Sequence, residues 1–230
     1  THFSTFMPMK NSVVIVAGGS GVRMGTAVPK QFLELNGLPV LMHTINRFYE
    51  YDNSMQIIVV LPQQEKIRWL ELIGKYKFQI PHLITDGGSS RTASVKNGLA
   101  LVKSEVTGIH DGVRPFISRS LLSTCYESAF LNGNAVPTIP VSETIREIFD
   151  DTSRTVDRNR YCLVQTPQCF QTDLIRKAYE KAGNKEFTDD ASVFEKAGHS
   201  IHLVDGNPEN IKITVPSDLL MAELYLKYKN

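Results

Sequence analysis

The glycine-rich segment 17–25 could bind phosphate groups through its backbone and two nearby cations. An apolar run, residues 13–17, leads directly into it, and the segment contains Arg23 and is followed by Lys30. Glycine accepts positive φ and has no Cβ, so several backbone N–H groups can converge on one anion. Arginine offers a planar fork of donors and lysine a compact charge, which are complementary ways of holding phosphate oxygens. These residues therefore predict a polyphosphate site.

Two better-known glycine loops do not match this segment. Gly19, Gly21 and Gly25 are spaced G-x-G-x-x-x-G, whereas a dinucleotide-binding loop requires G-x-G-x-x-G. Pro29 interrupts the stretch that follows, and the next strand-like run is followed by Pro62 rather than by an acid that could bind a ribose. No Gly-Lys-Ser or Gly-Lys-Thr occurs, which excludes a G-x-x-x-x-G-K-[ST] loop. The segment belongs to another nucleotide-binding type.

Asp111 and Arg114 follow the apolar run 106–110 and could bind a substrate. A single Asp-x-x-Arg is more often a turn with a surface ion pair, but this one falls at the same predicted sheet edge as the glycine segment. The acid could hold a substrate hydroxyl or help to position Mg²⁺, and Arg114 could reach substrate oxygens. Lys212 lies in 210–214, where we expect a short strand with a solvated lysine.

Two further segments can be read either as helix starts or as parts of a site. Asp86 to Val95 follows a strand-like run, and Ser89 or Ser90 is suited to cap the helix that begins there. Glycine amides at this position, including Gly88, and the Ser94 hydroxyl could also bond a nucleobase edge. Residues 188–191 are a second capped helix start.

The elements that must position these residues alternate along the chain. This alternation predicts an α/β fold, a mostly parallel wound sheet with helices on both faces, and ligands beyond the carboxyl ends of the strands. The expected strands are 13–17, 55–61, 81–85, 106–110, 134–139, 161–166 and 201–204, and the expected helices are 39–51, 63–75, 90–103, 118–131, 172–183, 189–197 and 215–228.

Residues 142–160 break this alternation and predict a projecting β-hairpin. Polar and apolar residues alternate with period two on both sides of a turn-rich centre, residues 150–153. Because an isolated hairpin is marginally stable in water, we expect this arm to pack against a second copy of the chain. The prediction is a homodimer with an intersubunit arm.

Composition restricts the possible functions. Of the 230 residues, 25 are basic and 24 are acidic, so the net charge is +1. This charge is too small to indicate a protein that binds nucleic acid or an anionic membrane. Three cysteines form no zinc-like or C-x-x-C spacing, and no Ser-His or Cys-His triad pattern is present. No run is long enough to span a bilayer. We expect a cytoplasmic protein with one domain over 13–228, and a disordered or artificially added start at 1–12.

Eight short motifs occur in order along the chain. They are Ala17-Gly18-Gly19-x-Gly21-x-Arg23-Met24, Pro29-Lys30-Gln31, Arg91-x-x-Ser94-Val95, His110-Asp111-x-x-Arg114-Pro115, Thr155-Val156-Asp157-Arg158, Gln165-Thr166-Pro167-Gln168, Thr188-Asp189-Asp190-Ala191 and Asn210-Ile211-Lys212. Each motif is weak alone, and the ordered set is specific. From Val13 to Leu226 the chain resembles one family, the 2-C-methyl-D-erythritol 4-phosphate cytidylyltransferases. Gly18, Ser89 and Gly112-Val113 depart from the residues usual in that family, whereas every charged position matches.

The resemblance implies a Rossmann-like nucleotidyltransferase fold and the reaction of CTP with a polyol phosphate, with Mg²⁺ bound largely through the CTP phosphates. It further implies that Arg23 and Lys30 stabilise the triphosphate, and that Lys212 and Arg158, the latter from a neighbouring subunit, position the acceptor phosphate. No protein side chain is expected as a dedicated metal ligand. Acceptor positions would be Asp111, Arg114 and Thr144, and cytidine positions would be Ala17, Gly18, Gly19, Gly88 and Ser94.

The chemistry that the resemblance implies needs no general base. A phosphomonoester is largely dianionic near neutral pH because its second pKa is about 6. The difficulty is to bring two polyanions together, which calls for Arg, Lys and a divalent ion. Two alternatives remain open: a ribitol 5-phosphate cytidylyltransferase, which would share the loop, and a nucleotide-binding module without activity, which the fold alone does not exclude.

Overall fold

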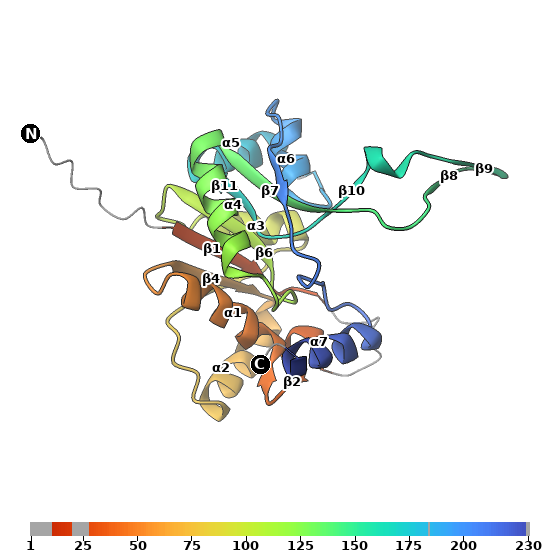
Figure 1. The fold of residues 1–230 in the computed structure, drawn as a ribbon. Helices are drawn as coiled ribbons and strands as arrows, with labels where there is room; N and C mark the ends of the chain where they lie inside the picture. Colours follow the sequence, from red (N-terminus) through yellow and green to blue (C-terminus); the bar gives the residue numbers. More distant parts are fainter. Residues whose placement is uncertain (1–10, 20–27, 184, 229–230) are drawn as a thin grey trace, which may run out of the picture.

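The computed structural model describes residues 11–19, 28–183 and 185–228. Within them, a central sheet carries helices on both of its faces (Figure 1). Its strands are β1 (Asn11–Val16), β4 (Gln56–Leu61), β5 (Leu83–Asp86), β6 (Val106–Asp111), β7 (Asn134–Pro140), β10 (Cys162–Val164), β11 (Gln168–Gln171) and β12 (Leu203–Asp205). The order is β10-β7-β11-β6-β1-β4-β5, and β12 pairs with β7.

The sheet is mostly parallel, as the alternation of elements predicts. The pairs β1 with β4, β1 with β6, β4 with β5 and β7 with β12 are parallel, whereas β11 and β10 run antiparallel to their neighbours. Parallel strands end at the same edge, so the residues that follow β1, β4, β5 and β6 are gathered there.

Seven helices accompany the sheet in the described part of the chain. Helices α1 (Val40–Tyr51), α2 (Lys66–Lys75) and α4 (Arg119–Asn132) cover one face, and α3 (Arg91–Leu99), α5 (Thr172–Ala182) and α6 (Asp190–Lys196) cover the other (Figure 1). Helix α7 (Pro216–Tyr228) packs beside the small hairpin of β2 (Glu34–Leu35) and β3 (Leu38–Pro39). The described residues also form three short 3₁₀ turns: η2 (Lys30–Phe32), η3 (Gln63–Glu65) and η4 (Arg158–Arg160). None of the described helices is long and apolar enough to cross a membrane.

The position of β1 in the sheet explains why residues 13–16 are apolar without interruption. Val13 and Ile15 are fully buried against the α1 and α4 side, and Val14 is fully buried against the α3 and α5 side. Successive side chains of a strand point to opposite faces, and both faces are covered here. A continuous apolar run is therefore what this position in the sheet requires.

The structure differs from the predicted elements in several places. Strand β1 begins at Asn11, two residues before the expected start, and the buried Ser12 hydroxyl donates to Thr107 Oγ1 at 2.8 Å. Strand β11 is absent from the prediction. The predicted strand at 210–214 is wrong, because this segment pairs with none of the described strands; Ile213 N donates to Val113 O.

The arm predicted at 142–160 is present. Strands β8 (Arg146–Phe149) and β9 (Thr152–Thr155) form an antiparallel hairpin that projects far from the rest of the molecule (Figure 1). No residue of either strand is buried. Apolar side chains are exposed along the hairpin and at β10 beside its base, with Ile148 78% exposed.

Candidate active site

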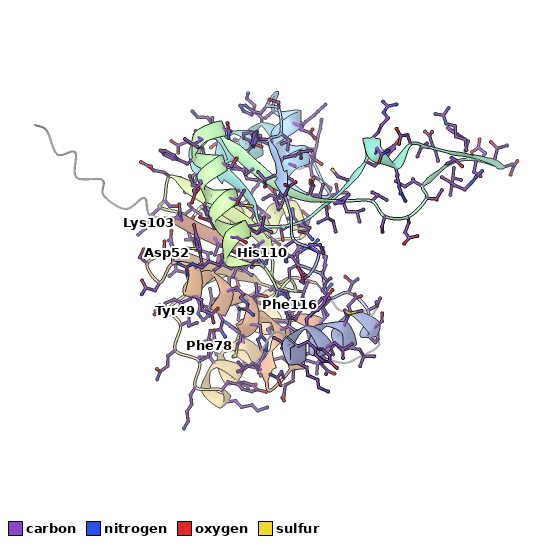
Figure 2. The ribbon with its side chains drawn as sticks, viewed as in Figure 1. Tyr49, Asp52, Phe78, Lys103, His110 and Phe116 are labelled. Carbon is purple, nitrogen blue, oxygen red and sulfur yellow. The ribbon has the colours of Figure 1, made fainter. Side chains whose placement is uncertain are left out.

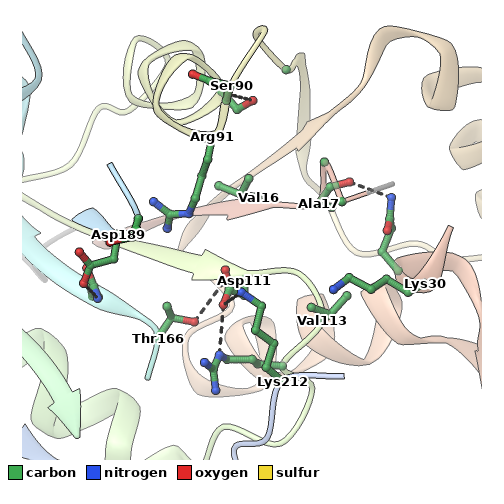
Figure 3. Close-up of a pocket in the computed structure, with 18 of the residues that line it drawn as sticks. Val16, Ala17, Lys30, Ser90, Arg91, Asp111, Val113, Thr166, Asp189 and Lys212 are labelled. Atoms are coloured by element: carbon green, nitrogen blue, oxygen red, sulfur yellow. Dashed lines mark hydrogen bonds and ion pairs between the residues drawn. The ribbon is translucent and has the colours of Figure 1, made fainter. Parts of the chain in front are cut away.

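A cavity of about 810 Å³ lies at the edge where β1, β4, β5 and β6 end (Figure 3). Most of the site residues that the sequence singles out line it. Figure 3 shows Lys30 on one side and Arg91 on the other, with Asp111 and Lys212 between them in this view. The predicted site residues in its lining are Ala17, Gly18, Gly19, Lys30, Gly88, Ser94, Asp111, Arg114 and Lys212.

The glycine segment and Lys30 form one wall of the cavity. Lys30 begins η2 and is 8% exposed, and its Cε lies 3.2 Å from where a Cβ of Gly19 would stand. Gln31 Nε2 donates to Ala17 O at 2.9 Å, which attaches η2 to the end of β1. Glycine at position 19 therefore leaves the space that the lysine chain needs to reach the loop. Arg23 lies outside the described residues.

The start of α3 forms a second wall. The Ser90 hydroxyl caps the helix by accepting from Ala93 N at 3.2 Å, as the sequence predicts. The Ser94 hydroxyl accepts from Gly88 N at 3.0 Å and donates to Ser90 O at 2.8 Å. A Cβ at Gly88 would overlap Ala93, so only glycine fits there. This wall is closely packed, and it presents backbone groups to the cavity.

Asp111 lies at the centre of a compact group of charges. Its carboxylate is 3.1 Å from Lys212 Nζ and 3.2 Å from Arg114 Nε, and its side chain is 13% exposed. Burial alone would raise the pKa of Asp111, but Lys212, Arg114 and Arg91 outweigh it and hold that pKa well below its usual range. Asp111 is therefore an anion that holds two cations at the cavity wall rather than a solvated surface residue.

Arg91 enters the cavity from α3 and is held by a fully buried carboxylate. Its Nη1 and Nη2 donate to the two Asp190 oxygens at 3.0 and 2.6 Å, and Tyr179 OH donates to the same carboxylate at 2.6 Å. Burial lowers the pKa of Arg91, but the Asp190 charge outweighs this and raises that pKa above its ordinary value. Gln168 Oε1 accepts from the backbone N–H of Asp190 at 3.0 Å. The network fixes α3 to the start of α6.

Arg158 and Thr144 are not brought to this cavity by their own chain. Both are exposed residues of the arm, and neither lines the cavity. Arg158 Nη1 donates to Ser142 O within the arm. If these two residues contribute to a site, it is not the one that their own sheet forms.

Several lining residues lie in the motifs, but the sequence alone does not single them out as site residues. Position 91 has the pattern of a first helical residue, and position 189 that of a cap, which it is: Asp189 accepts from Ser192 N at 3.0 Å. Gln165, Thr166 and Gln168 lie at the end of the strand-like run 161–166 or just after it, which is the signal that could have found them. The others do not directly follow a strand-like run. The lining residues of this kind are Gln31, Arg91, Gln165, Thr166, Gln168, Thr188 and Asp189, and Ser192 directly follows the motif at 188–191.

A sequence model of the 2-C-methyl-D-erythritol 4-phosphate cytidylyltransferases matches residues 11–228. The chain belongs to this family.

Solved and curated members of the cytidylyltransferase family match over nearly their whole length. A 2-C-methyl-D-erythritol 4-phosphate cytidylyltransferase of Phocaeicola vulgatus is 51% identical over 219 residues, covering 95% of this chain and 100% of that protein. One from Syntrophus aciditrophicus is 40% identical over 96% of this chain and 97% of the relative. The crystal structure of the Thermus thermophilus enzyme has a TM-score of 0.80 at 31% identity, covering 95% of this chain and 100% of that one.

Membership confirms the resemblance drawn from the eight motifs and the nucleotidyltransferase fold. Many of the residues that carry the resemblance come from the ends of β1, β5 and β6 and from the starts of α3 and α6, which meet at the cavity; the motif at 155–158 lies in the arm instead. The family assignment and the geometry therefore point to the same place on the molecule.

Proposed function

We propose that this chain transfers a cytidylyl group from CTP to 2-C-methyl-D-erythritol 4-phosphate, giving 4-diphosphocytidyl-2-C-methyl-D-erythritol and pyrophosphate. The observation that carries the proposal is one cavity with cations on separate walls, Lys30 beside the glycines and Lys212 beside Asp111. Such a cavity suits two phosphate-bearing substrates that must approach each other. The family membership supports CTP and the methylerythritol phosphate as these substrates.

Lys30 would stabilise the charge that develops on the triphosphate, together with Arg23. Lys212 and Arg114 would bind the acceptor half, where Asp111 holds both at 3.1 and 3.2 Å. A phosphate oxygen of the acceptor attacks the α-phosphorus of CTP, and pyrophosphate leaves with the electrons of the broken P–O bond. The attacking oxygen is already ionised near neutral pH, so positioned cations rather than a base supply the catalysis.

Mg²⁺ would be carried in with the nucleotide. Among the described residues, no group of three or more His, Cys, Asp or Glu side chains is placed to hold a metal ion. Asp111 and Asp189 are the carboxylates among the described lining residues; Asp111 lies against its two cations, and Asp189 caps α6. These residues fit an ion held mainly by phosphates, and the bound ion would neutralise part of their charge.

The arm supports a homodimer in which Arg158 and Thr144 act in the cavity of the partner. Both lie outside their own cavity, and the hairpin leaves Ile148 78% and Phe149 43% exposed. Equilibrium sedimentation tests the dimer: a monomer at micromolar concentration would contradict it. We further propose a cytoplasmic location, which the unpaired cysteines Cys125, Cys162 and Cys169 favour.

A matrix of nucleotides and acceptors, read by pyrophosphate release, tests the reaction. We expect the highest turnover with CTP and 2-C-methyl-D-erythritol 4-phosphate. Faster turnover of ribitol 5-phosphate would identify that compound as the acceptor instead. The relatives described above carry the methylerythritol name, which favours the first outcome. Binding of CTP without pyrophosphate release from any acceptor would instead favour a nucleotide-binding module.

A further inference from the structure

His110 is buried behind the cavity rather than exposed in it. It occupies the second-last position of β6, has no exposed surface and lies in the interior of the fold (Figure 2). The Phe48 ring packs edge-on against the imidazole, with ring centroids 4.9 Å apart. His110 therefore cannot touch a substrate. Both of its ring nitrogens nevertheless bond to residues that form the cavity wall.

The hydrogen bonds of His110 define which nitrogen carries the proton. Nε2 lies 3.1 Å from Arg114 O, and a carbonyl oxygen only accepts, so Nε2 must be the N–H donor. Nδ1 lies 3.0 Å from Thr166 Oγ1. That hydroxyl already accepts from Asp111 N at 3.1 Å, so its own proton is available to Nδ1. One neutral tautomer satisfies every group in this chain of hydrogen bonds.

Burial favours the same neutral form. Removal of the ring from water lowers the pKa of His110 to about 4, although the bonds to Arg114 O and Thr166 act in the opposite direction. At neutral pH the ring therefore carries one proton. The hydrogen-bond geometry already places that proton on Nε2.

The two bonds attach His110 to both ends of a single turn. Arg114 N donates to Asp111 O at 3.1 Å and closes this turn, which presents the Asp111 and Arg114 side chains to the cavity. His110 holds the Arg114 backbone directly and the Asp111 backbone through Thr166. A residue that only filled space would need the shape of the ring and no hydrogen bonds. Both ring nitrogens of His110 instead bond to groups that hold the turn.

We propose that His110, as the Nε2–H tautomer, is a positioning residue that sets the Asp111–Arg114 turn and thereby the acceptor half of the cavity. The inference rests on the proposed function for its kinetic consequence. Lys212 pairs with Asp111 and is displaced with it. Loss of the His110 bonds should therefore weaken the binding of the acceptor phosphate more than that of CTP, which is expected to bind at the glycine wall.

Two variants separate the two bonds. His110→Asn keeps an acceptor near the Nδ1 position for Thr166 and removes the bond to Arg114 O, whereas His110→Gln keeps a donor near the Nε2 position and removes the acceptor. We expect each to raise KM for the acceptor phosphate about tenfold, the factor for one hydrogen bond, with KM for CTP changed by less than about twofold. Leu122→Ala, in α4 away from the cavity, serves as the control for lost core stability.

Nitrogen-15 NMR of the imidazole in the wild-type protein provides a readout that needs no variant. We expect the signals of a neutral ring protonated at Nε2 and bonded at Nδ1. A ring protonated at Nδ1 or at both nitrogens near pH 7 would overturn the proposal, as would equal rises in KM for both substrates or the same rise in Leu122→Ala. A wild-type protein without transfer activity would refute the proposed function, and the NMR result would still decide the tautomer.

Discussion

Lys30 offers the sharpest test of how the cavity accelerates phosphoryl chemistry. The side chain is 8% exposed and reaches along the glycine wall, so it acts in a setting with little water. We consider Lys30→Met, which keeps an unbranched chain of similar length beside Gly19 and removes the charge. Lys30→Ala tests the same charge and also empties the space that the chain fills.

The size of the effect follows from charge and distance. Two unit charges about 4 Å apart interact by about 4 kcal/mol at an effective dielectric constant of about 20. CTP is already an anion before it reacts, so part of this attraction acts equally on the ground state and changes affinity only. The rest of the attraction acts on the negative charge that develops on the leaving pyrophosphate, and this part changes kcat. We expect kcat to fall by about 10²-fold to 10³-fold, as for other preorganised donors, with a smaller loss of CTP affinity.

Steady-state pyrophosphate release gives kcat, and direct titration with CTP in the absence of acceptor gives the dissociation constant. Lys103→Met is a matched control, because Lys103 is an exposed lysine at the opposite end of the sheet (Figure 2). Equal losses of kcat and CTP affinity in Lys30→Met would refute the reasoning, because uniform binding would then explain the whole effect. An unchanged kcat would refute it as well.

Three further predictions concern the remaining groups. Equimolar mixing of Lys30→Ala and Arg158→Ala subunits should restore about a quarter of wild-type activity, because half of the dimers become mixed and each mixed dimer has one intact site out of two. No recovery of activity after subunit exchange would argue against a site shared between subunits. Asp190→Asn should cost about 3 kcal/mol in urea unfolding, because the Arg91 guanidinium keeps its burial and loses its counter-charge; a cost below about 1 kcal/mol contradicts this. Between pH 6.5 and about 4, His110 binds a proton in the unfolded chain but not in the native state, so the free energy of unfolding falls by about 3 kcal/mol as pH decreases through this window. His110→Gln should remove this contribution to the pH dependence of the free energy of unfolding.

The sheet could be predicted because its strands combine two strong signals. Residues 57–61 are apolar in succession and are bounded by Pro62, and the structure covers both faces of β4 as this pattern requires. Strand β11 gives no such signal, because it has four residues with a glutamine at each end and enters the sheet antiparallel, without a crossover helix before it. The alternation at 210–214 is real, since Ile213 is buried and Lys212 is exposed. However, no strand in the described part of the chain pairs with this segment, and pairing depends on neighbours that a local pattern does not contain.

A residue of the cavity could be predicted most directly where it follows a recognisable strand. Asp111 is found in this way, because its position after 106–110 places it at the ligand-binding edge of a parallel sheet. Arg91 has the pattern of a helix start, and its pairing with Asp190 joins residues 99 positions apart. The same holds for Thr166 and His110, which are 56 positions apart. Such pairs become visible only when the fold brings the two strands or helices together.

The arrangement of charges explains why a cavity for two polyanions contains buried acids. Asp111 lies against Lys212 and Arg114, and Asp190 lies against Arg91, so each acid fixes cations in place before a substrate arrives. A cation held in this way needs little reorganisation when charge develops on a phosphate, and this is the condition under which electrostatic stabilisation is strongest. Removal of either acid would make the cavity more positive. It would also release the cations from the geometry that makes their charge useful, so greater net charge and faster transfer need not coincide.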